Sequence, residues 1–259
     1  MAGQMLLLVV STTLILALQT QYATAKKLPN FVHVCKRSDP QLEKCLVKTI
    51  ESLRPELPIG IPKMQIPALE PMVIPMLVVN RNVEALKVKA TIKDIRAWGG
   101  SKFVLSNLKV NLEKLNGEAT VVLPNLFVNC TYDIDGRLMV IPLQGQGMYV
   151  GNITNTKADI KASVEVMKDK KNRDYFQIKD VRIKLRVGDA VGKIIAQNNN
   201  RNNDAITETA SVFYHQNRRA VLDIVTPIAE EIAHEFALQI GNNILKTILY
   251  DEILPKELP

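Results

Sequence analysis

Residues 224–248 read IVTPIAEEIAHEFALQIGNNILKTI, and the spacing of their large apolar side chains bears most directly on the fold. An apolar residue recurs at every fourth position, at Ile224, Ile228, Ile232, Phe236, Ile240, Ile244 and Ile248. This spacing predicts a helix. Because four residues advance about 400° around a helix axis, the row drifts by roughly 40° per step and about 240° in all. A winding row favours a helix enclosed by a curving sheet, although a buried bundle helix fits the same row.

The residues from about 80 to 188 favour the enclosed helix, because their apolar side chains recur with a period of two. One run places Leu86, Val88, Ala90 and Ile92 between Lys87, Lys89, Thr91 and Lys93. A second run contains Phe176, Ile178, Val181, Ile183, Leu185 and Val187, and its slip after Ile178 predicts a bulge near Asp180. Turn signals fall at residues 99–100, 116–117, 135–136 and 170–172. The pattern predicts an antiparallel sheet with one dry and one wet face.

Prolines and polar residues mark the ends of the predicted helices. Asp39-Pro40 opens a first, short helix, which Pro55 ends. Residues 55–75 carry six prolines among apolar residues and predict an extended segment on a sheet edge or over an apolar surface. The polar residues 197–204 precede a long helical pattern from about Thr207 to Leu249, in which Pro227 predicts a kink or a fresh start.

The first 25 residues have the layout of a secretory signal peptide. Residues 6–18 are uncharged and almost wholly apolar, and Ala23-Thr24-Ala25 supplies the small residues of a cleavage site. The apolar run is shorter than the roughly 20 residues that span a bilayer. We therefore expect a secreted chain, in which residues 26–259 form a single elongated domain. Hydrophobic residues make up 47% of the sequence and aromatic residues only 5%, so its core must be mainly aliphatic.

The cysteines, sequons and charges fit an extracellular protein. In an oxidising compartment the close pair Cys35 and Cys45 should form a disulfide, which leaves Cys130 as a free thiol. Asn129 and Asn152 begin glycosylation sequons, and a glycan on Asn129 would direct the neighbouring Cys130 inward on a strand. The net charge of +7 is spread along the predicted strands. We expect no nucleic-acid partner, whereas transient contact with an anionic membrane fits this charge.

Motifs for catalysis are absent from the sequence. It contains no Gly-x-Ser-x-Gly elbow, no His-Glu-x-x-His and no phosphate-binding loop, so we predict no catalytic residue, no metal site and no cofactor. The paired acids Glu230-Glu231 are assigned to the solvated side of a helix start, where they favour the helix dipole. Gly145-x-Gly147 lacks a third glycine and predicts a bend where the sheet coils.

Several motifs recur along the chain in a recognisable order. The cysteine pair and the proline-rich segment come first, followed by residues 132–147 (YDIDGRLMVIPLQGQG), residues 213–217 (FYHQN), Pro227 and residues 250–255 (YDEILP). In order and spacing they resemble the insect takeout and juvenile-hormone-binding protein family over nearly the whole mature chain. Three cysteines cannot supply the second disulfide of the moth hormone carriers, so the chain resembles the takeout branch more closely. The resemblance implies an α+β fold, in which a strongly curved antiparallel sheet wraps a long C-terminal helix, as in bactericidal and lipid-transfer proteins.

The mostly aliphatic interior predicts that the protein binds a small apolar ligand. We expect a monomeric carrier that holds a fatty acid, a terpenoid or a juvenile-hormone-like lipid in an internal tunnel, with Tyr132, Tyr149 or Gln144 at its polar head group. Candidate lining residues are Trp98, Phe103, Val128, Cys130, Tyr132, Tyr149, Phe176, Ile232, Phe236 and Ile240. The alternatives are a membrane-surface or lipopolysaccharide-binding protein of the same fold, an extracellular signalling or interaction protein, and a hydrolase.

Overall fold

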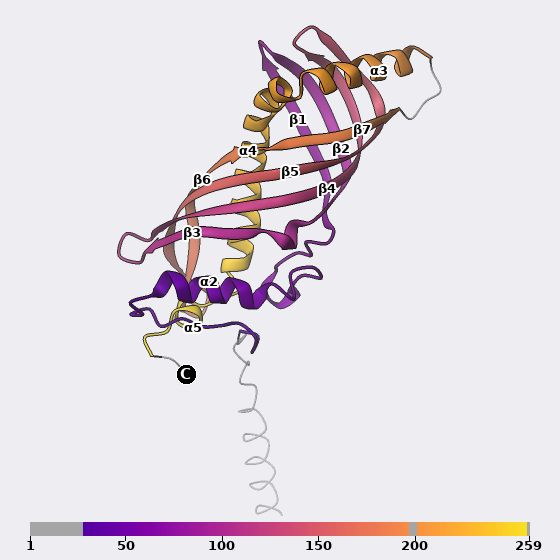
Figure 1. The fold of residues 1–259 in the computed structure, drawn as a ribbon. Helices are drawn as coiled ribbons and strands as arrows, with labels where there is room; N and C mark the ends of the chain where they lie inside the picture. The colour runs from indigo at the N-terminus through magenta and orange to yellow at the C-terminus, as the bar shows by residue number, and fades with distance from the viewer. Residues whose placement is uncertain (1–27, 197–200, 258–259) are drawn as a thin grey trace, which may run out of the picture.

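A curved antiparallel sheet forms the main body of the computed structural model, which describes residues 28–196 and 201–257. Five strands follow the order β1-β2-β4-β5-β6, while β3 pairs with β4 and β7 pairs with β5. Their bounds are β1 (Met72–Val83), β2 (Leu86–Trp98), β3 (Val104–Asn111), β4 (Asn116–Leu138), β5 (Ile141–Lys168), β6 (Asp174–Arg186) and β7 (Asp189–Ala196). The sheet wraps around the long helix α4 (Arg218–Leu245), as Figure 1 shows, which confirms the predicted fold class.

Two of the predicted turns are wrong, because the strands are longer than their turn signals indicate. Residues 116–117 and 135–136 lie inside β4, which has 23 residues and pairs along its length with the 28-residue β5. The chain turns instead at residues 112–115 and 139–140. Gly136 is required within the strand, since a Cβ there would collide with the carbonyl oxygen of Lys87 on β2. The turns predicted at residues 99–100 and 170–172 are confirmed.

The predicted bulge is also present. Ser163 of β5 faces Asp180 of β6, but the next residue, Val164, faces Ile178, so Lys179 is the extra residue. A second irregularity interrupts the pairing of β2 with β4 between Lys93 and Arg96. Bulges increase the local twist of a strand, which favours the curvature that encloses α4.

The winding apolar row contacts different parts of the protein along its length. Near its start, Ile224 and Ile228 pack against a core cluster of the sheet that includes Leu86 and Leu138. Near its end, Ile244 and Ile248 pack against a separate cluster formed by Val32, Ile61 and Met64. The two groups are far apart along the helix axis, and Ile248 lies beyond Leu245, where α4 ends earlier than predicted.

The helix boundaries differ from those predicted. Helix α3 (Arg201–Gln216) begins before Thr207, and the break between α3 and α4 falls at Asn217. At this break the side-chain amide of Asn217 donates a hydrogen bond to the carbonyl oxygen of Phe213 (2.9 Å). Pro227 lies inside α4, which continues through it. A proline removes one hydrogen bond of the helix. Packing of α4 against the surrounding sheet compensates for that loss.

The N-terminal segment closes the end of the sheet opposite α3 (Figure 1). Helix α2 (Leu42–Leu53) lies beside α5 (Tyr250–Ile253) at this end. Residues 55–71 are not extended as predicted, because they form turns that include the 3-10 helix η2 (Pro62–Met64). Turns suit prolines, whose nitrogen has no hydrogen to donate. The segment does lie over an apolar surface, and Pro75 lies on the edge strand β1.

The predicted signal peptide and residues 197–200 of the polar break lie outside the described residues. Among the helices of the described segments, none is both long and apolar enough to cross a membrane.

Candidate functional site

An apolar cavity of about 480 Å³ lies between the concave face of the sheet and the two C-terminal helices. It is nearer to α3 than to α2, and we call this part of the molecule the α3 end (Figure 1). The sheet contributes the inward residues of β1, β2, β4, β5 and β7, and α4 contributes Val221, Leu222, Val225, Ile228, Ala229 and Ile232. Small-molecule sites typically have volumes of roughly 300–1,000 Å³ and mainly apolar walls. Both properties therefore suit a small apolar ligand.

Four residues place polar groups at this cavity: Tyr149, Ser211, Tyr214 and His215. The Tyr214 hydroxyl donates a hydrogen bond to the carbonyl oxygen of Ala190 (2.6 Å). No hydrogen bond joins the Tyr149 hydroxyl to another described residue. Burial raises the pKa of Tyr149 to about 12, and the neighbouring Tyr214 and Cys130 add to the shift. Like a tyrosine of ordinary pKa, Tyr149 is neutral at physiological pH, and its hydroxyl can donate a hydrogen bond to a ligand.

Glycines make room for the Tyr149 ring. A Cβ on Gly192 of β7 would lie 2.6 Å from the Tyr149 hydroxyl oxygen, and a Cβ on Gly151 would collide with the same group. A Cβ on Gly147 would likewise lie 2.7 Å from the hydroxyl oxygen of Tyr132. The glycines on β5 and β7 thus allow two tyrosine rings to lie flat against the sheet.

A larger hollow is the groove of about 970 Å³ between the free edges of β1 and β6. Helix α4 forms its floor, and Arg81, Arg182, Lys184, Glu230 and Glu231 are among the lining residues. Arg81 and Glu231 form an ion pair across it. Charged groups lose hydration when a hydrocarbon covers them. The smaller apolar cavity is therefore the better candidate site for a lipid.

Polar residues of α4 pair with the free backbone edge of β6. Glu230 accepts a hydrogen bond from the Leu185 N–H (2.9 Å), and His234 Nδ1 lies 2.7 Å from the Val181 carbonyl oxygen. Asn242 accepts a hydrogen bond from the Ile178 N–H (2.7 Å). An unpaired strand edge is a site for unwanted strand addition, so these contacts protect it.

Glu230 therefore has a different role from the predicted one. It lies in the middle of α4 rather than at a helix start, and it also accepts a hydrogen bond from Lys184 (2.9 Å). Partial burial raises its pKa, but the hydrogen bonds from Leu185 and Lys184 outweigh that effect and leave the pKa below its ordinary value. Tertiary pairing with β6, which local sequence does not report, accounts for the difference.

A second apolar cavity of about 300 Å³ lies under the hairpin of β3 and β4. Its lining includes Phe176 of β6 and Leu254 near the C-terminus. The Phe176 ring also contacts the Tyr250 ring, with 4.4 Å between the centroids. Two separate hollows therefore exist at opposite ends of the sheet.

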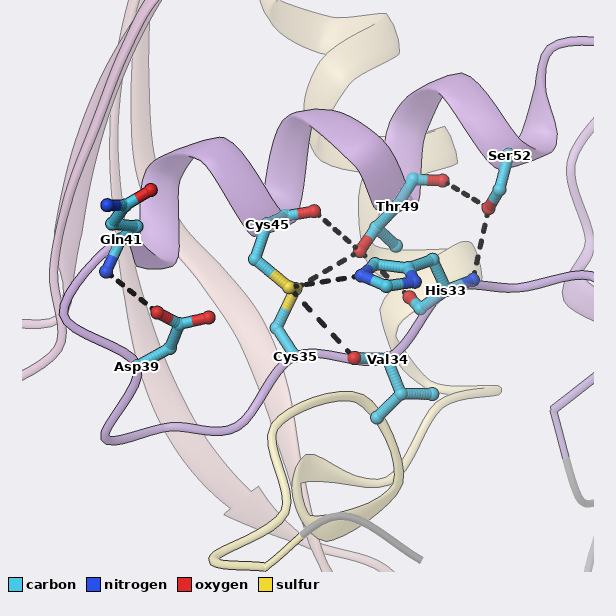
Figure 2. The surroundings of a disulfide bond; sticks show 8 residues. All are labelled: His33, Val34, Cys35, Asp39, Gln41, Cys45, Thr49 and Ser52. Atoms are coloured by element: carbon cyan, nitrogen blue, oxygen red, sulfur yellow. Dashed lines mark hydrogen bonds between the residues drawn. A yellow bond between two sulfur atoms is a disulfide. The ribbon is translucent and has the colours of Figure 1, made fainter.

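The end of the molecule around α2, which we call the α2 end, contains the predicted disulfide between Cys35 and Cys45. Figure 2 shows the hydrogen bonds around it. The Thr49 hydroxyl donates to the carbonyl oxygen of His33 (2.8 Å), and the Ser52 hydroxyl accepts from the His33 N–H (3.1 Å). His33 lies close to both sulfurs, but the disulfide consumes the two thiols that a metal ion would need. The cluster ties residues 33–35 to α2.

The predicted lining residues are distributed over several environments. Tyr149 and Ile232 line the 480 Å³ cavity, Ile232 and Phe236 line the charged groove, and Phe176 lines the second cavity. Trp98 packs against Phe127, with 5.4 Å between the ring centroids.

The remaining predicted residues lie outside these hollows. The Arg54 guanidinium lies 4.5 Å above the ring centre of Phe103. Ile240 is half-buried on α4, and β4 directs Val128, Cys130 and Tyr132 to the same face as the cavity residue Ile134. Burial raises the pKa of the Cys130 thiol. At the sequons, Asn152 is exposed on β5 and Asn129 is half-buried on β4.

Of the predicted lining residues, only Tyr149 and Ile232 border the 480 Å³ cavity, so most of its wall was missed. The inward residues of β2 are the alternating run Leu86, Val88, Ala90 and Ile92, and all four line the cavity. The motif at 213–217 also contributes Phe213, Tyr214 and His215. Alternation indicated the dry face, but not which part of that face borders empty space.

Comparisons with known proteins agree with this architecture. A family model described as haemolymph juvenile hormone binding protein (JHBP) matches residues 8–255. The chain belongs to this family. The resemblance inferred from the motifs is thereby confirmed. Two relatives of this chain are the circadian clock-controlled protein daywake of Drosophila melanogaster and that of Drosophila yakuba. Each is 25% identical over 230 residues, covering 86% of this chain and 87% of the relative.

A solved structure has a similar fold. Takeout 1 of Epiphyas postvittana matches with a TM-score of 0.69 and 21% sequence identity. The match covers 86% of this chain and 99% of the takeout chain. Both chains therefore share the curved sheet around a long C-terminal helix.

Proposed function

We propose that this protein is a secreted carrier that holds one small apolar ligand in the 480 Å³ cavity. The observation that carries the proposal is the cavity itself, whose wall is hydrocarbon except for a few polar groups. Membership in a family described by juvenile hormone binding supports a fatty acid, a terpenoid or a juvenile-hormone-like lipid as the ligand class. The signal-peptide layout of residues 1–25 supports secretion.

The binding energy comes from transfer of the ligand out of water. Each methylene that enters the cavity contributes about 0.8 kcal/mol. Loss of translational freedom and ordering of side chains offset part of this gain. A ligand of about 15 carbons should therefore bind with micromolar to nanomolar affinity. Because aliphatic walls discriminate weakly between chains of similar shape, we expect several related lipids to bind.

Tyr149 provides the one polar anchor that we assign. Its hydroxyl has no hydrogen-bond partner among the described residues, and it is protonated at physiological pH. A carboxylate, ester or hydroxyl oxygen of the ligand would accept its hydrogen bond. Tyr149→Phe should weaken binding of a fatty acid by about 2- to 12-fold, and leave binding of a plain hydrocarbon of similar length unchanged. Equal loss for both ligands would contradict this assignment.

The proposal is tested by extracting the purified mature protein with organic solvent and identifying the recovered molecules by mass spectrometry. Displacement of a fluorescent fatty acid then gives the affinity. Ala229→Trp on α4 places a large ring in the cavity and should weaken binding by at least about tenfold. Ala220→Trp is the matched control, because Ala220 is exposed on the same helix. Failure to recover any lipid, together with no binding of the fluorescent fatty acid, would exclude the carrier function.

A further inference from the structure

The α3 end of the sheet carries an exposed apolar tip. Two turns meet there, the β1–β2 turn beside Val83 and the β4–β5 turn at Met139 and Val140. The Met139 N–H donates a hydrogen bond to the Ala85 carbonyl oxygen (2.7 Å), so the two turns form one unit. Val140 is 86% exposed, Val83 is 55% exposed and Met139 is 44% exposed. Figure 1 shows both turns at the end of the sheet beside α3. We call residues 83–85 and 139–140 the hairpin tip.

The hairpin tip adjoins the cavity directly. Leu86, Leu138 and Ile141 flank the two turns in sequence, and all three line the 480 Å³ cavity. The exposed apolar residues of the tip are thus continuous along the chain with the apolar wall of the cavity. Other apolar residues are exposed elsewhere, for example Ile59 near the α2 end, whose neighbours in sequence do not line the cavity. Val78 and Val191 are also exposed between cavity residues, but they lie within strands rather than at a turn.

Two cations lie immediately behind the tip. Lys87 of β2 and Arg137 of β4 occupy directly opposed positions in the strand pairing, and both side chains are exposed. Neither forms an ion pair with another described residue, and the exposed Glu84 in the β1–β2 turn forms none either. Like charges directly opposite each other on neighbouring strands are destabilising. An anionic surface that contacts the tip would reduce the repulsion between Lys87 and Arg137.

We infer that the hairpin tip is a docking surface for anionic lipid bilayers, through which the cavity exchanges its ligand. Val83, Met139 and Val140 would enter the interface between head groups and acyl chains, while Lys87 and Arg137 contact the anionic head groups. The inference rests on the proposed carrier function, because it names the surface from which the apolar ligand is taken or to which it is delivered. A ligand that passes through the tip avoids full exposure to water.

Vesicle sedimentation tests the docking. The mature protein is mixed with phosphatidylcholine vesicles that contain about 30% phosphatidylserine, and with pure phosphatidylcholine vesicles. We expect sedimentation with the anionic vesicles, which falls as salt rises from about 0.1 M to 1 M. Val140→Asp should reduce the bound fraction by at least about tenfold, and Lys87→Glu and Arg137→Glu by about fivefold each. The matched controls are Ile59→Asp, an exposed apolar residue near the α2 end, and Lys170→Glu in the β5–β6 turn.

Two results would overturn the inference: no sedimentation with the anionic vesicles, or a Val140→Asp variant that sediments like the unaltered protein. Equal sedimentation with neutral vesicles would overturn the role of Lys87 and Arg137. Thermal unfolding verifies that each variant is folded, which is expected because the substituted side chains are exposed.

The rate of ligand transfer separates docking from the carrier function. Transfer of a fluorescent fatty acid from the protein to anionic vesicles should speed up with vesicle concentration if the tip docks. Val140→Asp should slow this transfer without changing the affinity for the fatty acid in solution. A transfer rate that is independent of vesicle concentration would contradict docking but leave the carrier function intact. Vesicle binding by a protein that binds no fatty acid would leave the docking surface standing but exclude the carrier function, and with it ligand exchange through the tip.

Discussion

The apolar row from Ile224 to Ile248 is enclosed differently at the two ends of the sheet. At the α2 end, Ile248 is buried against Val32, Ile61 and Met64, and the disulfide ties α2 to residues 33–35. At the α3 end, Ile228 and Ile232 are only half-buried, and they border the 480 Å³ cavity. Close packing around Ile248 thus supplies stability at the α2 end, whereas at the α3 end the same row borders space for a ligand.

The largest expected effect tests this difference directly. Ile248→Ala should lower the free energy of unfolding by about 2–5 kcal/mol, because it leaves a new void among buried side chains. Ile228→Ala should cost only about 1–2 kcal/mol, since its half-buried side chain already borders a hollow and loses mainly the transfer term. Urea unfolding of both variants measures the difference. Equal losses would mean that the two ends are packed alike.

Removing the disulfide gives the next largest effect. Replacing Cys35 and Cys45 by alanine should lower the free energy of unfolding by about 2–3 kcal/mol, because the loop between them is no longer constrained in the unfolded chain. The affinity for a fluorescent fatty acid should not change, since the cavity lies at the other end. Cys130→Ala is the control for loss of a thiol. A large loss of affinity in the double variant would show that the ends are coupled.

The contact between α4 and the edge of β6 should have a smaller effect. Asn242→Ala leaves the Ile178 N–H without its hydrogen-bond partner and should cost about 1–3 kcal/mol. Asn243→Ala is the matched control, because the neighbouring Asn243 is exposed. Urea unfolding measures both. If the two variants lose the same stability, the side-chain pairing with β6 contributes nothing specific.

The last effect concerns pH at the α3 end. The pKa of Tyr149 is raised from an ordinary value of 10.0 to about 12 by burial, so the folded protein disfavours the tyrosinate. The corresponding stability is present below pH 10 and is lost as the pH rises from about 10 to about 12. Comparing unfolding of the unaltered protein and Tyr149→Phe across this range measures the contribution. A Tyr149 that ionises together with exposed tyrosines would contradict its burial beside the cavity.

Local patterns predicted the elements whose periodicity is strong. The row from Ile224 to Ile248 predicted an enclosed helix, and the slip after Ile178 predicted the bulge opposite Ser163. Asp135-Gly136 was misread as a turn, because a glycine required by a close strand neighbour looks the same in sequence as a glycine required by a turn. The fresh start that Pro227 suggested is wrong, since α4 begins at Arg218 and runs on through the proline to Leu245.

The sequence by itself determined the helix, the dry face of the sheet, the disulfide and the family, because each depends on residue type and spacing along the chain. Only the tertiary structure decided that Leu86, Val88 and Tyr149 border the cavity, while Trp98 packs against Phe127. It also assigned Glu230 and Asn242 to the edge of β6. A cavity is the space left between elements, and its position depends on distances between residues far apart in sequence, which periodicity within one element does not contain.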